Sequence, residues 1–374
     1  DGLLLHAGVG AEAGYDTNVY YDSSKPIGSS IFRVMPFAEI TNATRNGAVG
    51  TQLTFDARAG LQYRHYGNSE IRSAYADAWN PNAGLSLSYG GAQFGFGVAD
   101  VFARIEDPPY ATGGIPQSGA IERTNNQASV EGRWAPGGGR LTTTLRYTNM
   151  VDVYGGLYSY ADSVTHTLML DVSWKWLPKT AVFANFQQSY LDYYNHGPTA
   201  KSDAYPLTAT VGARGLLTAK TSVLLALGYT NSFYQTGGST SGVWGQTYAN
   251  LAFTVLPTQL SRVVVGFRHD FLNAVISNFA YEDTVYAAYV QQLVGRLGLD
   301  LSGRYARLDY GGAFVDPAQS GRVDNLFQIG ATLDYFLRNW AYVGAGYSLL
   351  DNRSNIATDS YLKQQVFARL GVTY

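Results

Sequence analysis

The C-terminal segment, residues 361–374, alternates apolar and polar side chains with a period of two and ends on an aromatic residue. Its polar face carries Lys363, Gln365 and Arg369. A strand that is apolar toward lipid and polar toward a lumen is typical of the last strand of an outer-membrane β-barrel. We therefore predict that Tyr374 faces lipid at the periplasmic end and is the assembly signal. The apolar face consists of Val366, Ala368, Leu370, Val372 and Tyr374.

The same period recurs along the chain. It is clearest at residues 52–64, 167–176, 262–270 and 327–335. A helix would spread these apolar residues around its circumference, so the period favours strands. Aromatic side chains near the strand ends predict the interfacial girdle of a membrane barrel. These girdle candidates are Tyr89, Trp134, Tyr147, Trp174, Trp176, Tyr335 and Tyr374.

The links between these segments alternate in length, as short periplasmic turns and longer outer loops do in a bacterial barrel. Counting strands between the links predicts a transmembrane antiparallel β-barrel of about 18 strands (16 as the alternative), with both termini in the periplasm. We expect residues 1–374 to form this single domain. Short links occur near residues 90–91, 135–139, 177–180, 217–221, 256–261, 294–298 and 337–339, and the longer links include 21–29, 106–120, 153–163, 195–203, 236–242, 309–322 and 351–360.

The composition agrees with a barrel. Charged residues make up 14% of the 374 residues, against roughly 25% in a soluble domain. No stretch approaches the ~20 apolar residues of a membrane helix. The absence of Cys excludes a disulfide framework and a thiolate metal site. A soluble propeller or solenoid is the alternative, but the chain lacks the recurring motif that such repeats carry.

The compartment follows from the same reasoning. The chain begins at Asp1 without a basic and apolar leader, so we expect a processed mature end of an exported Gram-negative outer-membrane protein. The formal net charge is −2, and no Lys/Arg run points to nucleic acid.

The N-terminal segment adds a resemblance. Residues 14–20 (GYDTNVY) contain the pattern aromatic–Asp–X–Asn at a predicted strand end, and residues 31–36 (IFRVMP) contain the pattern apolar–X–Pro in the next predicted strand. Both patterns resemble those of the β-barrel porin type 2 family. Thr17 stands where many members have Asp. The resemblance implies an outer-membrane barrel related to the 18-stranded, myxobacterial type of exopolysaccharide-secretion protein, without a catalytic motif. Pro36 cannot donate to the ladder, so it marks either a bulge or an ordinary strand start.

The inferred lumen is the charge-rich surface. A lining of inward basic and acidic residues has two interpretations: it guides an anionic polymer, or its charges pair with one another within a water-filled lumen. The slight excess of basic residues favours an anionic polymer only weakly. We expect Asp56 to pair with an inward arginine. The predicted pore-lining residues are Arg58, Arg64, Arg133, Arg146, Lys175, Arg214, Arg268, Arg304, Arg338, Arg369, Asp56, Asp171, Asp270, Asp300 and Asp334.

One long link is a candidate gate. The link 106–120 opens with the turn-prone run Glu106, Asp107, Pro108, Pro109 and Tyr110, and it could fold inward and narrow the lumen. A plain surface loop is the other interpretation, because long outer loops are typical of barrels.

Catalysis has little support in the sequence. An outer-membrane lipase needs a nucleophilic Ser within reach of a His at the lipid face. The outward His65, His166 and His269 have no Ser neighbour on their own face, and no His-X-X-X-His spacing suggests zinc. We therefore expect no enzyme, no metal and no cofactor.

Two functions from different classes remain. The first is an export conduit for a secreted exopolysaccharide, passive at this step, gated by loops, monomeric, and supplied by a periplasmic polysaccharide-export protein. The second is a general or solute-selective diffusion porin. An adhesive barrel with a blocked lumen comes third, because 16–18 strands leave aqueous space.

Overall fold

The computed structural model describes residues 3–42, 53–74, 79–106, 122–195, 201–236, 244–293 and 295–374. Eighteen antiparallel strands form one sheet, and β1 pairs with both β2 and β18, so the sheet closes into a barrel. The predicted fold class and strand count are confirmed. The first nine strands are β1 (Leu4–Asp16), β2 (Ser29–Thr41), β3 (Leu53–Tyr66), β4 (Trp79–Gly90), β5 (Phe94–Glu106), β6 (Glu122–Trp134), β7 (Leu141–Tyr154), β8 (Ser163–Leu177) and β9 (Thr180–Asp192). The other nine are β10 (Leu207–Leu216), β11 (Thr221–Asn231), β12 (Thr247–Thr258), β13 (Ser261–Asn273), β14 (Ser277–Gln292), β15 (Leu297–Phe314), β16 (Val323–Arg338), β17 (Ala341–Ser354) and β18 (Tyr361–Thr373).

Helical segments are confined to the links. In the described part of the chain, no helix is long and apolar enough to cross a membrane. The helical segments are α1 (Ser69–Ala74), α2 (Pro136–Gly139), η2 (Gly156–Ala161), η3 (Trp244–Gln246), η4 (Pro317–Gln319) and η5 (Ala357–Asp359).

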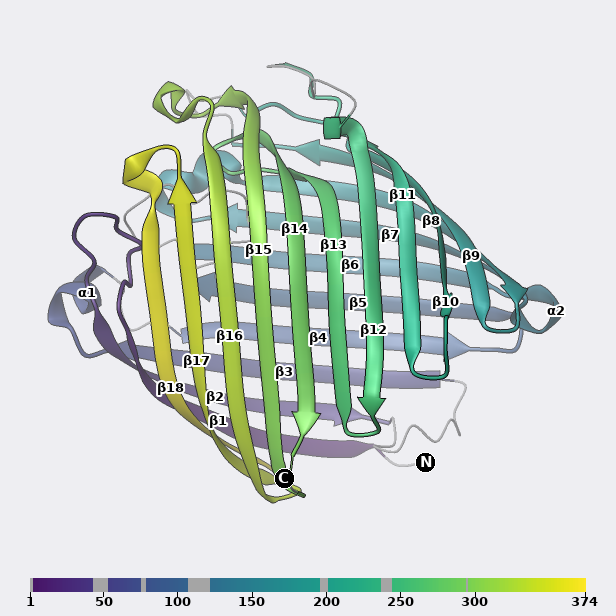
Figure 1. The fold of residues 1–374 in the computed structure, drawn as a ribbon, viewed down its shortest axis with the longest axis horizontal. Helices are drawn as coiled ribbons and strands as arrows, with labels where there is room; N and C mark the ends of the chain where they lie inside the picture. Colours follow the sequence, from purple (N-terminus) through teal and green to yellow (C-terminus); the bar gives the residue numbers. More distant parts are fainter. Residues whose placement is uncertain are drawn as a thin grey trace.

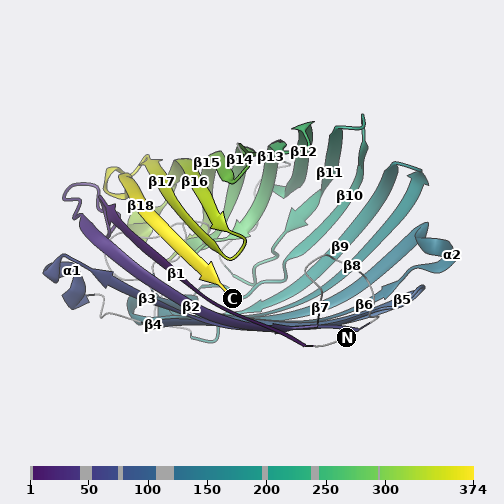
Figure 2. The ribbon, with the colours of Figure 1, turned by 90° about the horizontal axis from the view of Figure 1, so that it is seen from below.

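The strands are strongly tilted. In Figure 1 the front strands β12–β18 cross the rear strands β2–β8 steeply, as the opposite walls of a closed barrel do. Figure 2 shows β1 and β18, the first and last strands, side by side. The start of β1 and the end of β18 lie on the side of the short turns, which is the periplasmic side of an outer-membrane barrel.

The turn between β6 and β7 shows the local chemistry of a periplasmic link. Gly137 and Gly138 have φ values of 62° and 72°, a left-handed conformation that glycine adopts without steric cost. The Pro-Gly-Gly-Gly sequence of α2 therefore reverses the chain in a few residues.

Alternate side chains divide each strand between two faces. Large apolar side chains are exposed on one face, for example Leu61, Leu85, Phe96, Val211 and Leu225. An exposed apolar band around a closed barrel is a lipid-facing surface. The other face therefore lines the lumen.

The structure differs from the sequence-based expectations in three details. β15 and β17 continue to Phe314 and Ser354, past the predicted ends at residues 309 and 351, because their hairpins extend beyond the apolar band. Pro36 marks neither a bulge nor a strand start, because it lies inside β2 and the β2–β3 register is the same before it (Val34 with Tyr63) and after it (Phe37 with Gly60). The links that join β2 to β3, β3 to β4 and β13 to β14 are absent from the predicted links.

The outer face carries a polar contact between β5 and β6. Asp100 of β5 pairs with Leu85 on one side and Ala128 on the other, so it points outward. The Nδ2 atom of Asn126 donates to its carboxylate at 3.2 Å. Val98 and Phe102 flank it on the same face.

The N-terminal motif closes the barrel seam. Asp16 is fully buried, and its carboxylate accepts from the amide of Asn18 (2.8 Å) and the Nε2 of Gln365 (2.7 Å) and pairs with the Nζ of Lys363 (2.9 Å). Asn18 donates to the Leu362 carbonyl at 3.1 Å. The residues that carry the family resemblance thus join β1 to β18, and we call this cluster the seam clasp.

Deleting Tyr374 should lower the yield of folded barrel several-fold, because we predict that this terminal aromatic residue is the assembly signal. The Tyr374 amide donates to the Ala7 carbonyl at 2.8 Å, and its side chain is 95% exposed. The measurement is the fraction of outer-membrane protein that shows a heat-dependent gel shift. Tyr335→Ala removes another outward aromatic and is the control; equal losses in both variants would reject a special role for Tyr374.

Candidate functional site

The strand register places most predicted pore-lining residues on the face opposite the apolar band. Arg338 is the exception, because it lies at the end of β16 beside a register shift. The role of these residues in conduction stays a prediction. The residues on the luminal face are Arg58, Arg64, Arg133, Arg146, Lys175, Arg214, Arg268, Arg304, Arg369, Asp56, Asp171, Asp270, Asp300 and Asp334.

Acids one or two strands away pair with several luminal arginines. Arg146 pairs with Glu131, Arg369 pairs with Asp334, and Arg33 pairs with Glu12 at 3.0 Å. Glu282, which the sequence analysis did not single out, is almost buried and pairs with Arg304 at 2.5 Å and Arg268 at 3.7 Å. Four of the eight predicted luminal arginines, Arg146, Arg268, Arg304 and Arg369, are therefore held in ion pairs.

Other luminal cations contact rings and hydroxyl groups. The guanidinium of Arg58 lies 4.7 Å from the ring centroid of Phe37. Arg214 donates to the Oγ of Ser173 at 3.1 Å. The pairing of Asp56 with an inward arginine stays a prediction.

The turn between β13 and β14, residues Ala274–Ile276, spans the outer mouth of the barrel. Val275 packs in one cluster with Tyr154, Tyr158 and Ala161, which belong to β7 and η2 on the opposite wall. Ala274 and Ile276 pack with Ala280, Leu308, Leu326 and other residues of the β14–β18 side. The turn therefore connects the two walls across the lumen.

A buried lysine fastens this turn. The Nζ of Lys201, in the link between β9 and β10, donates to the carbonyls of Ala274 and Ser277, the latter at 2.8 Å. It also lies 4.8 Å from the ring centroid of Tyr193. Burial lowers the pKa of Lys201 to about 7 and raises the pKa of Tyr193. We call η2, Lys201 and Ala274–Ile276 together the cap.

The pattern of link lengths does not predict the cap. The turn between β13 and β14 has only three residues and is not polar, so it does not stand out as a link. Lys201 lies within the predicted polar link 195–203. The apolar triplet Ala274-Val275-Ile276 at a hairpin tip was the available signal, because an exposed tip would be polar.

The cap should open more readily at pH 6 than at pH 9. Between the folded pKa of Lys201 of about 7 and about 10.5 in water, the capped state holds the amine neutral while the open state binds a proton. A rise in pH through this window therefore favours the capped state. Below about pH 7 the amine is protonated in both states, and the capped state is destabilised by the full free energy of burying a charged lysine. Open probability in planar bilayers measures this dependence.

The matched variants test the origin of that dependence. Lys201→Met should remove the pH dependence, and Lys179→Met in a periplasmic turn should retain it. An unchanged pH profile in Lys201→Met would assign the effect to another group; Tyr193 and the Arg123–Asp152 pair line the same cavity.

Two adjoining cavities occupy the lumen beneath the cap. The one at the cap has a volume of about 250 Å³ and includes Lys201 and Val275 in its lining. The other has about 670 Å³ and is lined mainly by inward side chains of β8–β12. Met150, Thr165 and Asn273 line both.

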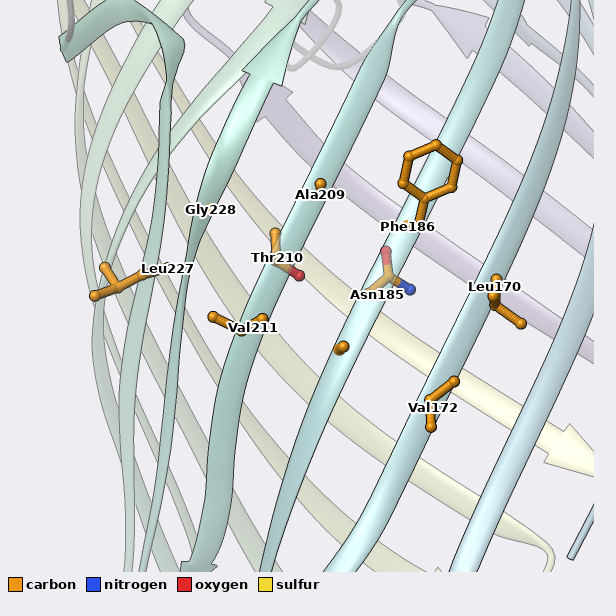
Figure 3. A pocket seen from close by; sticks show the side chains of 10 residues that line it. Leu170, Val172, Asn185, Phe186, Ala209, Thr210, Val211, Leu227 and Gly228 are labelled. Atoms are coloured by element: carbon orange, nitrogen blue, oxygen red, sulfur yellow. The ribbon is translucent and has the colours of Figure 1, made fainter.

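Two further hollows lie on the lipid face of β8–β11. Their volumes are about 320 and 600 Å³, and outward apolar side chains line them. Figure 3 shows Leu170, Val172, Phe186 and Val211 on neighbouring strands around the first. Small outward residues, including Ala184, leave this depression, which suits acyl chains and provides no polar chemistry.

The outward histidines are engaged in local contacts. The Nδ1 of His166 lies 2.8 Å from the Oη of Tyr147. The Nδ1 of His269 lies 2.8 Å from Asp283, but its ring is fully buried and cannot reach a lipid. Among the described residues, no group of three or more His, Cys, Asp or Glu could hold a metal ion.

The candidate gate cannot be placed. Glu106 ends β5, and Asp107, Pro108, Pro109 and Tyr110 lie outside the described residues.

Comparisons with known proteins support the fold. No protein family matches the chain, and no curated protein matches it. The structure is similar to that of OccK5 (OpdH) from Pseudomonas aeruginosa, with 12% identity over 99% of this chain and 98% of that one and a TM-score of 0.53. It is also similar to the siderophore receptor PirA from Acinetobacter baumannii, with 9% identity over 99% and 80% of the two chains and a TM-score of 0.48.

These identities are too low to transfer a function, and the resemblance to the β-barrel porin type 2 family has no family match behind it. The closed ring of eighteen strands, the apolar outer band and the polar lumen belong to a protein that spans the bacterial outer membrane.

Proposed function

We propose that this barrel is an export conduit for a secreted exopolysaccharide. The observation that carries the proposal is a closed ring of eighteen strands with a luminal face of hydrogen-bonding side chains. A ring of this size leaves an aqueous channel. The N-terminal resemblance supports the same function.

Translocation would be passive at this step. A hydrated chain would exchange hydrogen bonds with the luminal wall at several weak sites, as conduction requires. A periplasmic polysaccharide-export protein would deliver the chain, and the cap would seal the outer mouth at rest. The barrel would act as a monomer without catalysis.

A diffusion porin is the second candidate. The cavity of about 670 Å³ favours it, because pockets of about 300–1,000 Å³ suit small molecules.

Deleting the gene should abolish surface polysaccharide while intracellular synthesis continues. Complementation with the intact gene should restore the surface polymer. If the polymer still reaches the surface and small-solute uptake falls, the diffusion porin is the correct function.

A further inference from the structure

We infer that the luminal cavity of about 670 Å³ in the wall of β8–β12 binds an uncharged stretch of saccharide. This inference rests on the proposed export function and adds the chemical class of the substrate. It differs from the sequence-based expectation, in which a slight excess of inward basic residues weakly favoured an anionic polymer.

Hydroxyl and amide groups dominate the 670 Å³ cavity. Its lining includes Thr167, Asn185, Gln187, Thr208 and Asn250. Hydroxyl and carboxamide groups each offer both donors and acceptors, as sugar hydroxyls do. Each sugar hydroxyl entering the cavity could therefore donate to one wall group and accept from another.

The wall groups come in ordered pairs. The Oγ1 of Thr167 lies 2.8 Å from the Oγ of Ser189, and Thr208 and Thr230 are joined in the same way at 3.1 Å. Both pairs line the cavity, so a sugar hydroxyl could donate to or accept from these hydroxyl groups.

The charges of this cavity disfavour a polyanion. Its charged lining residues are Asp171 and Asp270, and no Lys or Arg of the described chain lines it. The nearby Arg268 is shared between Asp270 at 3.8 Å and Glu282 at 3.7 Å. A uronic-acid chain would meet carboxylates here, whereas anion sites present Arg or Lys.

An aromatic residue completes the wall. Tyr248 of β12 lines the cavity and combines an apolar ring with a hydroxyl group. The ring of such a side chain can lie against the C–H face of a sugar ring, and its hydroxyl group can form a hydrogen bond with a sugar hydroxyl.

The position of the cavity suits a chain on its way out. Asn273 lines both cavities, and its Oδ1 accepts from the Oη of Tyr234 at 2.8 Å beside the cap. A saccharide in the larger cavity would therefore reach the cap next.

The experiment uses the full chain in planar bilayers and two probes of equal length. Neutral isomaltohexaose should produce current blockades at concentrations at least tenfold lower than anionic hexagalacturonate. Saturation-transfer NMR on the detergent-solubilised barrel measures binding of both probes without depending on an open cap.

Two variants locate the site. The double variant Gln187→Leu with Asn250→Leu should weaken isomaltohexaose binding at least fivefold while the protein keeps its heat-dependent gel shift. Gln328→Leu, on the opposite luminal wall, should bind as the unmodified chain does.

The outcomes separate this inference from the export function. Stronger binding of hexagalacturonate, binding of neither probe in the NMR experiment, or equal binding by both variants would each overturn the inference and leave the gene-deletion result standing. Tight neutral binding by a barrel whose deletion leaves surface polymer unchanged would overturn export and keep the saccharide site.

Discussion

An Asp16→Ala variant should lose about 3–5 kcal/mol of unfolding free energy, because it leaves one member of a buried ion pair without its partner. The Lys363 side chain is only 6% exposed, and its Nζ would keep a carbonyl at 3.4 Å (Val19) and the ring of Tyr21 as neighbours. Urea unfolding in lipid vesicles, followed by tryptophan fluorescence, measures the loss.

Asp22→Ala is the matched control in the link that follows β1. Asp22 is half-buried, and its carboxylate accepts from the amides of Lys25 and Ser24, which lowers its pKa. We expect this variant to lose about 1 kcal/mol. Equal losses for Asp16→Ala and Asp22→Ala would contradict the seam clasp, and a Lys363→Met double-mutant cycle should show coupling of about 0.5–3 kcal/mol.

An Arg322→Met variant should release the two outer loops that follow β15 and β17. Arg322 is 1% exposed; it donates to Asp324 at 2.7 Å and pairs with Asp359 at 3.3 Å. Burial raises the pKa of Asp359, although Arg322 lowers it. Losing the guanidinium leaves two buried carboxylates unpaired, at a cost of about 3–5 kcal/mol.

The readout is limited proteolysis, since opening is local to these loops. Cleavage within residues 315–322 should accelerate at least tenfold in Arg322→Met. Arg353→Ala removes an arginine whose side chain is 70% exposed, and exposed pairs contribute only about 0–1 kcal/mol. Similar cleavage rates in both variants would show that the buried pair does not hold the loops.

The barrel could be predicted from the sequence because its two signals are local. Alternation along each strand and the lengths of the links need no knowledge of distant contacts, and together they gave eighteen strands. The pattern blurred at residues 98–104 for a physical reason: Asp100 points outward and bonds Asn126, so a polar residue sits on the apolar face.

The cap could not be predicted because it depends on contacts between distant segments. Lys201 is buried by a turn 73 residues away, and nothing in its own neighbourhood distinguishes it from a surface lysine. The pairing of the luminal charges was hidden in the same way. The count of inward charges predicted only a slight basic excess, whereas the contacts of Glu282 with Arg268 and Arg304 become visible only once the strands are in register.

The seam clasp also sets the order of events as the chain folds. Its contacts join residues 344 and 349 positions apart, so, like the rest of the β1–β18 pairing, they cost more loop-closure entropy than the contacts within any hairpin. The hairpins can form early, and the ring must close last. Until then β1 and β18 are free edges able to pair with another chain. A weakened clasp would therefore first prolong the lifetime of this open sheet and increase its aggregation, before it lowers the stability of the closed barrel.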